Sequence, residues 1–222
     1  MEDSPQIAST LYALSQIDVK VVVFTLRENR LQVLLACLAP SGVRQLPGLP
    51  FIAGRTLEDT AAQCVTQYTG LHEIYLEQLY TYFSLDRNAV SVVYFALVPA
   101  DSLLNGKDES SAEWFPVESL PVLIADHGDI LTYALRRLRY KLEYSAVGFE
   151  LLPDHFSLSE LQSTYELILG EKLDKRNFRR RILQAGIIES TTHRRSGEGR
   201  PAQLYRYRPD AVAEVKARRL FP

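Results

Sequence analysis

The sequence predicts an α+β protein in which a strand-rich first part is followed by a helical part that ends in a β-hairpin. Up to about Pro121, runs of β-branched and aromatic residues are bounded by turn signals, as is typical of strands. From Asp129 onward, apolar residues recur at helical spacing instead. The charge changes sign at the same place: residues 1–125 hold 7 basic and 14 acidic residues (−7), whereas residues 126–222 hold 18 and 13 (+5). We therefore expect two parts with different functions.

The composition is that of a globular protein. Of its 222 residues, 46% are hydrophobic and 23% are charged, which disfavours wholesale disorder and a coiled-coil rod. The apolar runs are shorter than the ~20 residues of a membrane span, and the start MEDSPQ does not resemble a signal peptide. The two cysteines, Cys37 and Cys64, form neither a disulfide framework nor a cluster with histidines that would bind zinc. We expect a cytoplasmic protein without a membrane segment.

Three strands are predicted in the first part, at residues 19–26, 31–38 and 91–98. The four residues between the first two strands are short enough for a hairpin. A helix is predicted at residues 57–68, with Thr56 as its N-cap and a glycine as its stop. The apolar positions of this helix fall on one face, which we expect to be buried: Leu57, Ala61, Cys64, Val65 and Tyr68.

A long amphipathic helix is predicted at residues 129–144, where the two parts meet. The pair Asp126 and His127 precedes it. This pair can act as an acid–base pair, or Asp126 can cap the helix beside a polar junction residue, which is the interpretation we favour. The apolar face of the helix must pack on one or both parts and consists of Ile130, Leu131, Ala134, Leu135, Leu138 and Leu142.

Two further helices are separated by a short turn. The first covers residues 157–169 and opens with a capping box formed by Ser157 and Glu160. The second covers residues 175–184, and Asp174 can cap it. Glycines follow both helices and are expected to end them.

A β-hairpin completes the chain, with strands at residues 187–192 and 203–208 around a basic, Gly-rich loop at residues 193–202. Helix, turn, helix and hairpin in this order are typical of a winged helix-turn-helix. We expect Tyr205 and Tyr207 to pack in the hairpin and the core and not to act as stacking platforms for bases.

Basic residues are concentrated in residues 172–208, which hold 11 basic and 3 acidic residues (+8). Such a patch attracts phosphate backbones. Phe178, Ile182 and Leu183 are expected to face the core, which leaves the basic side chains of the second helix outward. A basic helix can also be an ordinary solvated face, and a winged helix can be a protein-docking module. The predicted DNA-binding residues are Lys175, Arg176, Asn177, Arg179, Arg180, Arg194, Arg195 and Arg200.

Residues 46–71 resemble the signature of the Nudix family, whose glutamates bind the Mg²⁺ that polarises a diphosphate. When the chain is aligned with the family signature on Gly70 and Leu71, no carboxylate stands at the positions of the metal-binding glutamates. These positions hold Arg55, Cys64, Gln67 and Tyr68, and Gln63 stands at the position of the signature's arginine. The downstream acids Glu73, Glu77 and Asp86 are more simply solvated charges. The resemblance therefore implies a Nudix-like fold that is not an enzyme and has no catalytic residue, metal site or cofactor.

A second resemblance covers roughly residues 19–208. Residues 112–121 and 126–139, and C-terminal segments such as 173–179, resemble the Nudix-related transcriptional regulators, which join a Nudix-like sensor to a winged helix. The resemblance implies an N-terminal α/β/α sandwich with a mixed sheet and a C-terminal winged helix-turn-helix. The domains implied are an effector-binding domain at 1–125, a linking helix at 126–150 and a DNA-binding domain at 151–222.

This resemblance implies a ligand-responsive repressor or activator that binds a double-stranded DNA operator and a nucleotide or sugar effector. In the branch that controls NAD metabolism the effector is ADP-ribose or a related nucleotide, but Leu49-Pro50 replaces a Gly-containing turn expected there. We expect the effector around Arg44, Gln45 and Phe51, although Arg44 can equally be a surface charge. A homodimer is expected because paired half-sites raise affinity. The alternative is a residual hydrolase of nucleoside diphosphate sugars with a nucleic-acid-binding appendage.

Overall fold

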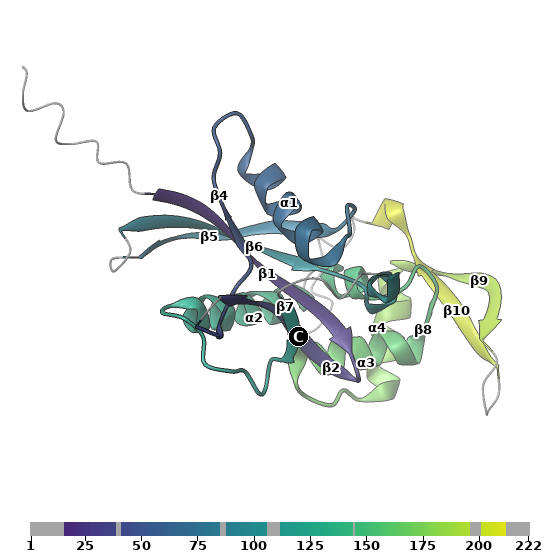
Figure 1. Ribbon diagram of the computed structural model, residues 1–222. Coiled ribbons are helices and arrows are strands. Elements are labelled where there is room, and N and C mark those ends of the chain that lie inside the picture. Colours follow the sequence, from purple (N-terminus) through teal and green to yellow (C-terminus); the bar gives the residue numbers. More distant parts are fainter. Residues whose placement is uncertain are drawn as a thin grey trace, which may run out of the picture.

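A computed structural model describes residues 16–38, 41–84, 88–105, 112–143, 145–195 and 201–211. Its larger sheet has seven strands in the order β3-β2-β1-β6-β5, with β4 pairing with β1 and β7 with β2 (Figure 1). The strands of this sheet are β1 (Gln16–Arg27), β2 (Arg30–Leu38), β3 (Val43–Gln45), β4 (Gly48–Pro50), β5 (Tyr75–Ser84), β6 (Ala89–Leu97) and β7 (Ala112–Pro116).

The sheet is mixed because its central strand β1 runs parallel to β6 and antiparallel to β2 and β4. All three predicted strands are confirmed as β1, β2 and β6, and β1 is longer than predicted at its start. The predicted hairpin is confirmed as well, since Arg27 pairs with Arg30 across the tight turn between β1 and β2. The strands β3, β4, β5 and β7 were not predicted.

Helix α1 (Leu57–Thr69) covers one face of this sheet. Thr56 and Asp59 form a capping box at its start, and Gly70 ends it in the left-handed conformation at φ 75°. Its predicted face is confirmed, because Ala61, Cys64 and Val65 are buried and Leu57 and Tyr68 pack against the same cluster.

Helix α2 (His127–Leu142) covers the opposite face of the sheet. Its buried residues are Ile130, Leu131, Ala134, Leu138 and Leu142, with Leu135 packed at the margin, as predicted. Figure 1 shows the sheet between these two helices, which is an α/β/α sandwich. The predicted end of the helix at residue 144 lies outside the described residues.

The C-terminal elements are α3 (Leu158–Leu169), α4 (Lys175–Ala185) and a small sheet in the order β8-β10-β9. Its strands are β8 (Phe156–Ser157), β9 (Ile188–Arg195) and β10 (Ala202–Tyr207). Both predicted helices and their caps are confirmed. The predicted loop is too long, because β9 extends to Arg195 and β10 begins at Ala202. The fold class is thus an α+β sandwich followed by a winged helix-turn-helix.

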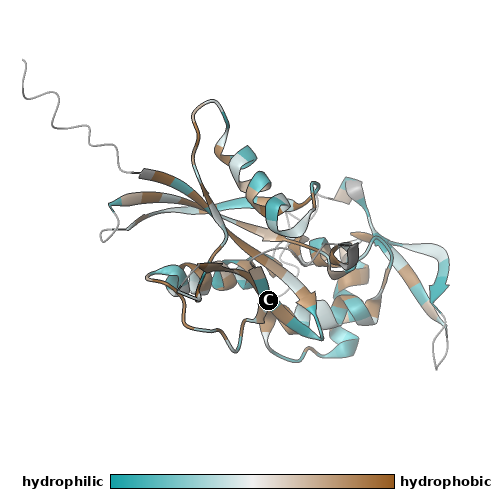
Figure 2. Ribbon diagram, viewed as in Figure 1, coloured by the Kyte–Doolittle hydropathy of each residue, from teal (hydrophilic) through white to brown (hydrophobic). Residues whose placement is uncertain are grey.

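One hydrophobic cluster joins the two parts of the chain. It runs from Phe24 and Phe95 of the large sheet through Leu138 of α2 to Tyr165 of α3 and Ile182 of α4. In Figure 2 the central strands are mostly hydrophobic, whereas much of the β9–β10 hairpin is polar. Because this packing is continuous, the domain boundaries at residues 125 and 150 stay a prediction. No helix in the described part of the chain has the length and hydropathy of a membrane span.

Candidate nucleic-acid interface and sensor site

Helix α4 is held on α3 by a short apolar face. Phe178 and Ile182 are buried, and the ring of Phe178 lies 5.5 Å from that of Tyr165 on α3. Asp174 caps the helix by accepting a hydrogen bond from the backbone N–H of Asn177 at 2.7 Å. The prediction that Leu183 faces the core is wrong, since it is 51% exposed. The fully buried side chains of α4 are those of Phe178 and Ile182, which lie one helical turn apart on the same face.

The basic side chains of α4 differ in how free they are. Lys175 and Arg176 are exposed and make no ion pair or side-chain hydrogen bond with the described residues. Arg180 donates to Asn177 on the same helix at 2.8 Å. Arg179 is half-buried and donates to the Ser159 hydroxyl of α3 at 3.1 Å. The start of α4 therefore offers two unpaired cations to a ligand outside the chain.

The wing, which is the β9–β10 hairpin, carries the remaining predicted DNA-binding residues. Arg194 is exposed on β9. Arg195 instead forms an ion pair with Glu160 of α3. Arg200 lies outside the described residues. Tyr207 packs on Phe149 with ring centroids 4.9 Å apart, and Tyr205 is half-buried against the core, so the expectation for both tyrosines is confirmed.

The turn between α3 and α4 is fixed by Glu166. Its carboxylate accepts hydrogen bonds from the backbone N–H of Leu173 at 3.0 Å and from the side chains of Gln162 and Lys172, each at 2.8 Å. Gln162 also donates to the Leu173 carbonyl at 3.0 Å. The hydrogen bond from Lys172, followed by that from Leu173, lowers the pKa of Glu166 below its ordinary value. This network sets the angle at which α4 leaves α3.

The predicted sensor residues all lie near the start of β1, but they do not share one face. Arg44 of β3 forms an ion pair with Glu113 at 3.0 Å and lies over the ring of Phe115. Gln45 is its neighbour on the strand and therefore projects to the opposite face. Phe51 follows β4, and its backbone N–H bonds to the carbonyl of Ile17 at 3.0 Å. The structure thus brings the three residues to one end of the sheet without joining their side chains.

The positions of the Nudix signature lie on α1 and the loop before it. Arg55 donates to Gln63, and burial raises the pKa of the Cys64 thiol to about 12. Among the described residues, no group of three or more His, Cys, Asp or Glu side chains is arranged to hold a metal ion. Glu77 is not merely solvated as predicted, because it pairs with Lys141 of α2 and accepts from the Tyr75 hydroxyl. Asp86 lies outside the described residues.

His127 ties the first turn of α2 to the strand segment of the sensor residues. It is 1% exposed, and its Nδ1 accepts a hydrogen bond from the backbone N–H of Leu46 at 3.0 Å. The Arg44 carbonyl accepts from the backbone N–H of Ile124 at 3.0 Å just before the helix. Asp126 occupies the N-cap position as predicted, but its side chain makes no capping hydrogen bond. His127 is therefore a structural junction residue.

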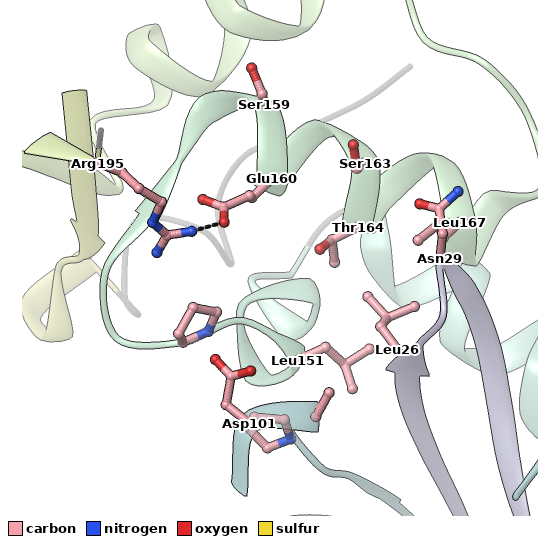
Figure 3. A pocket seen from close by; sticks show the side chains of 13 residues that line it. Leu26, Asn29, Asp101, Leu151, Ser159, Glu160, Ser163, Thr164, Leu167 and Arg195 are labelled. Carbon is pink, nitrogen blue, oxygen red and sulfur yellow. Dashed lines mark hydrogen bonds and ion pairs between the residues drawn. The ribbon is translucent and has the colours of Figure 1, made fainter. Parts of the chain in front are cut away.

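A cavity of about 500 Å³ that sequence reasoning missed lies between the large sheet and α3 (Figure 3). The end of β1 and the segment after β6 form one wall, and α3 forms the other. Asp101 and Thr164 face each other across it, with Arg195 and Glu160 at one end. None of the predicted sensor residues lines it. Its walls come from segments far apart in the sequence, so no local pattern could reveal it.

Known proteins share this arrangement over most of the chain. A sequence profile of the NrtR DNA-binding winged helix domain matches residues 148–207. The chain is 34% identical over 201 residues to the ADPR responsive transcriptional repressor NtrR of Acinetobacter baylyi, which covers 85% of this chain and 80% of that protein. The crystal structure of Shewanella oneidensis NrtR complexed with a 27mer DNA has 32% identity and a TM-score of 0.79, covering 89% of this chain and 95% of that one.

A MutT/nudix family protein from Enterococcus faecalis, at 21% identity and a TM-score of 0.74, covers 90% of each chain and shows the shared fold. A Nudix-like sandwich joined to a winged helix defines the class of Nudix-related transcriptional regulators, which confirms the resemblance seen in the sequence. The identity extends through both parts of the chain. Within this class, the chain belongs to the NrtR family.

Proposed function

We propose that the chain is a cytoplasmic, ADP-ribose-responsive repressor that binds duplex DNA through α4 and the wing. The observation that carries the proposal is the exposed cationic start of α4, where Lys175 and Arg176 have no partner within the described chain. It stands in a winged helix that matches the NrtR DNA-binding domain. We propose that Asn177, Arg179, Arg180, Arg194 and Arg200 also belong to this interface, and Arg195 is considered separately.

DNA binding is tested with the double variant Lys175→Ala, Arg176→Ala. If both cations neutralise phosphates, affinity falls and the slope of log K against log salt becomes shallower by about 1.8, since each phosphate contributes about 0.9. Fluorescence anisotropy with a duplex that the wild type selects from a randomised library measures both quantities. The matched control is Arg136→Ala, Arg137→Ala, which removes two exposed charges of α2. Equal slopes in wild type and the Lys175 variant would contradict the proposal.

ADP-ribose is proposed as the effector because the Acinetobacter baylyi relative is an ADPR responsive repressor. We propose Arg44, Gln45 and Phe51 as its contacts, since they gather at one end of β1 and Glu113, the partner of Arg44, is 63% exposed to solvent. A ligand at 100 times its Kd stabilises the folded chain by about 2.7 kcal/mol. A thermal-shift titration measures this gain, which Arg44→Ala should reduce. No shift with ADP-ribose at any concentration would rule this effector out.

We propose further that the chain does not hydrolyse its ligand. The Nudix positions that hold carboxylates in the family hold Arg55, Cys64, Gln67 and Tyr68 here, and Mg²⁺ requires hard oxygen ligands. An assay of ADP-ribose and nucleoside diphosphate sugars with and without Mg²⁺ tests this. Metal-dependent turnover would favour the alternative of a residual hydrolase, which the shared fold with the Enterococcus faecalis protein keeps open.

A homodimer is proposed because one winged helix covers a short stretch of duplex and paired half-sites raise affinity through effective concentration. Sedimentation equilibrium of the full chain, with and without the selected duplex, measures the number of copies. A monomer in both conditions would contradict this part of the proposal.

A further inference from the structure

One face of β9 lies against the start of the helix-turn-helix. His193 and Arg195 are two residues apart on this strand, so both point to the same side. The ring of His193 packs edge-on against the ring of His155, with centroids 5.1 Å apart. Arg195 forms an ion pair with Glu160 and donates a hydrogen bond to the His155 carbonyl at 3.3 Å. We call these four residues, His155, Glu160, His193 and Arg195, the wing brace.

Glu160 stands at the centre of the wing brace because its two carboxylate oxygens do different things. Oε2 accepts a hydrogen bond from the backbone N–H of Ser157 at 2.7 Å and completes the capping box of α3. Oε1 pairs with Arg195. The same side chain therefore orders the first turn of α3 and holds the wing against it.

Arg194 provides an internal comparison on the same strand. It neighbours Arg195, so it projects from the opposite face of β9, and it is exposed. It has no ion pair or side-chain hydrogen bond within the described chain. Both arginines are exposed, but they differ in their partners: Arg195, whose side chain is 48% exposed, is paired with Glu160, whereas Arg194 has no partner within the described chain.

We infer that Arg195 is a positioning residue for DNA binding that acts through Glu160 and does not contact phosphate. This inference rests on the proposed function, and it gives Arg195 a different role from the other wing arginines that we predicted to bind DNA. Arg195 fixes the direction of the wing relative to α3, whereas Arg194 on the open face meets the backbone of the duplex. Loss of the ion pair loosens the wing and lowers affinity without removing a phosphate contact.

The substitution Glu160→Gln separates the two roles of Glu160. Glutamine can still accept from the Ser157 N–H, so the cap is retained, but the charge that holds Arg195 is lost. If Arg195 is a brace, this variant binds DNA about 2- to 5-fold more weakly, the scale of an exposed ion pair. If Arg195 were a phosphate contact, removing the nearby negative charge would instead raise affinity.

The experiment measures DNA affinity against salt for wild type, Glu160→Gln, Arg195→Ala, the double variant and Arg194→Ala, with the selected duplex described above. We expect the wild-type salt slope in the first three variants, non-additive losses in the double variant, and a slope shallower by about 0.9 in Arg194→Ala. Circular dichroism tests whether each variant is folded. If Arg195→Ala is not folded, Glu160→Gln alone still shows whether loss of the ion pair lowers or raises DNA affinity.

The inference is overturned if Arg195→Ala makes the salt slope shallower, as Arg194→Ala does. It is also overturned if the losses of DNA affinity in Glu160→Gln and Arg195→Ala add in the double variant, or if Glu160→Gln binds DNA as well as or better than wild type. These results leave the proposed function intact, because the wild type still binds the duplex. Failure of the wild type to select any duplex is instead a failure of the proposed function.

Discussion

His127 shows how one side chain can join segments that are distant in the sequence. It lies at the start of α2, and its ring accepts from Leu46, 81 residues earlier. Because Nδ1 accepts this bond, the proton of the neutral imidazole is on Nε2. The residue type alone suggested a polar junction, but its partner could not be predicted, since backbone N–H groups look alike in a sequence.

Replacing His127 by alanine is expected to destabilise the fold by about 1–3 kcal/mol, because the buried N–H of Leu46 loses its acceptor. Urea denaturation of the full chain measures the free energy of unfolding. His72→Ala is the control, since His72 is exposed. Equal losses in both variants would mean that the bond to Leu46 contributes nothing.

Glu166 makes the stability of the helix-turn-helix depend on pH. Its pKa is lower in the folded chain than the ordinary value of 4.5, so ionised Glu166 stabilises the fold above pH 4.5 and this contribution disappears as the pH falls through the folded pKa. Relative to Glu166→Gln, the wild type should be more stable at about pH 7 and lose that advantage at an acidic pH below the folded pKa. Urea titrations at both pH values measure the difference, and an advantage that persists at the lower pH would contradict the assignment.

Among single residues, the sequence predicted caps well and partners poorly. Thr56, Ser157 and Asp174 all cap as expected, because an N-cap needs only its own chain three residues on. For Arg44 and Arg195, which are predicted to meet ligands, the structure shows carboxylate partners within the protein that the sequence did not indicate. Such pairs depend on the fold, which brings together residues 69 and 35 positions apart.

At the level of elements, helices and long buried strands were predicted, but strands that depend on their neighbours were not. β5 carries half-buried residues along most of its length, so it has no clear alternation of apolar and polar positions. β3 and β4 have three residues each and exist because β2 and β1 lie beside them. The last residues of β9 resemble a loop in the sequence because they are basic, and they form a strand because Arg194 and Arg195 pair with Gln203 and Ala202 of β10.

The last turn of helix α2 is attached to two other elements, the large sheet and α3. Lys141 reaches Glu77 and Tyr75 of β5, and Arg139 donates its Nε–H to the carbonyl of Ile168 in the last turn of α3 at 2.8 Å. Arg139→Met keeps an apolar stem of similar length but leaves that helix-end carbonyl without its donor. We expect a loss of about 1 kcal/mol in the free energy of unfolding, measured with urea. The control is Arg137→Met on the exposed side of α2, which should cost nothing measurable.

In the whole molecule, the sensor residues and the DNA-binding helices are linked through consecutive contacts. Arg44 and Leu46 bond to the start of α2, and α2 bonds to α3 through Arg139. A ligand that alters the strand at Arg44 can therefore shift α2 and, with it, the orientation of the winged helix. The overall plan of two parts and a linking helix was visible in the sequence, whereas the shared core was not.

If ADP-ribose controls DNA binding, each ligand must change the affinity of the other by the same factor, typically about 5- to 150-fold. Titrating ADP-ribose with and without the selected duplex, and the duplex with and without ADP-ribose, measures the two factors. Arg139→Met should reduce both coupling factors by the same amount, because it weakens the link between α2 and α3. Identical ADP-ribose affinities with and without DNA would exclude allosteric control by this compound.

The parallel pairing of β1 with β6 also governs when the chain can fold. Gln16 pairs with Ala89, and Phe24 with Leu97, so the middle of the sheet has a high contact order and cannot close before the ribosome has made residue 97. The pairing of β2 with β7, from Gln32 to Ala36, forms only when residues 112–116 have also been made. The winged helix is synthesised last, and its core packs against the sandwich in one shared hydrophobic cluster. During synthesis, the Nudix-like sandwich therefore precedes the winged helix and provides the surface on which the winged helix assembles.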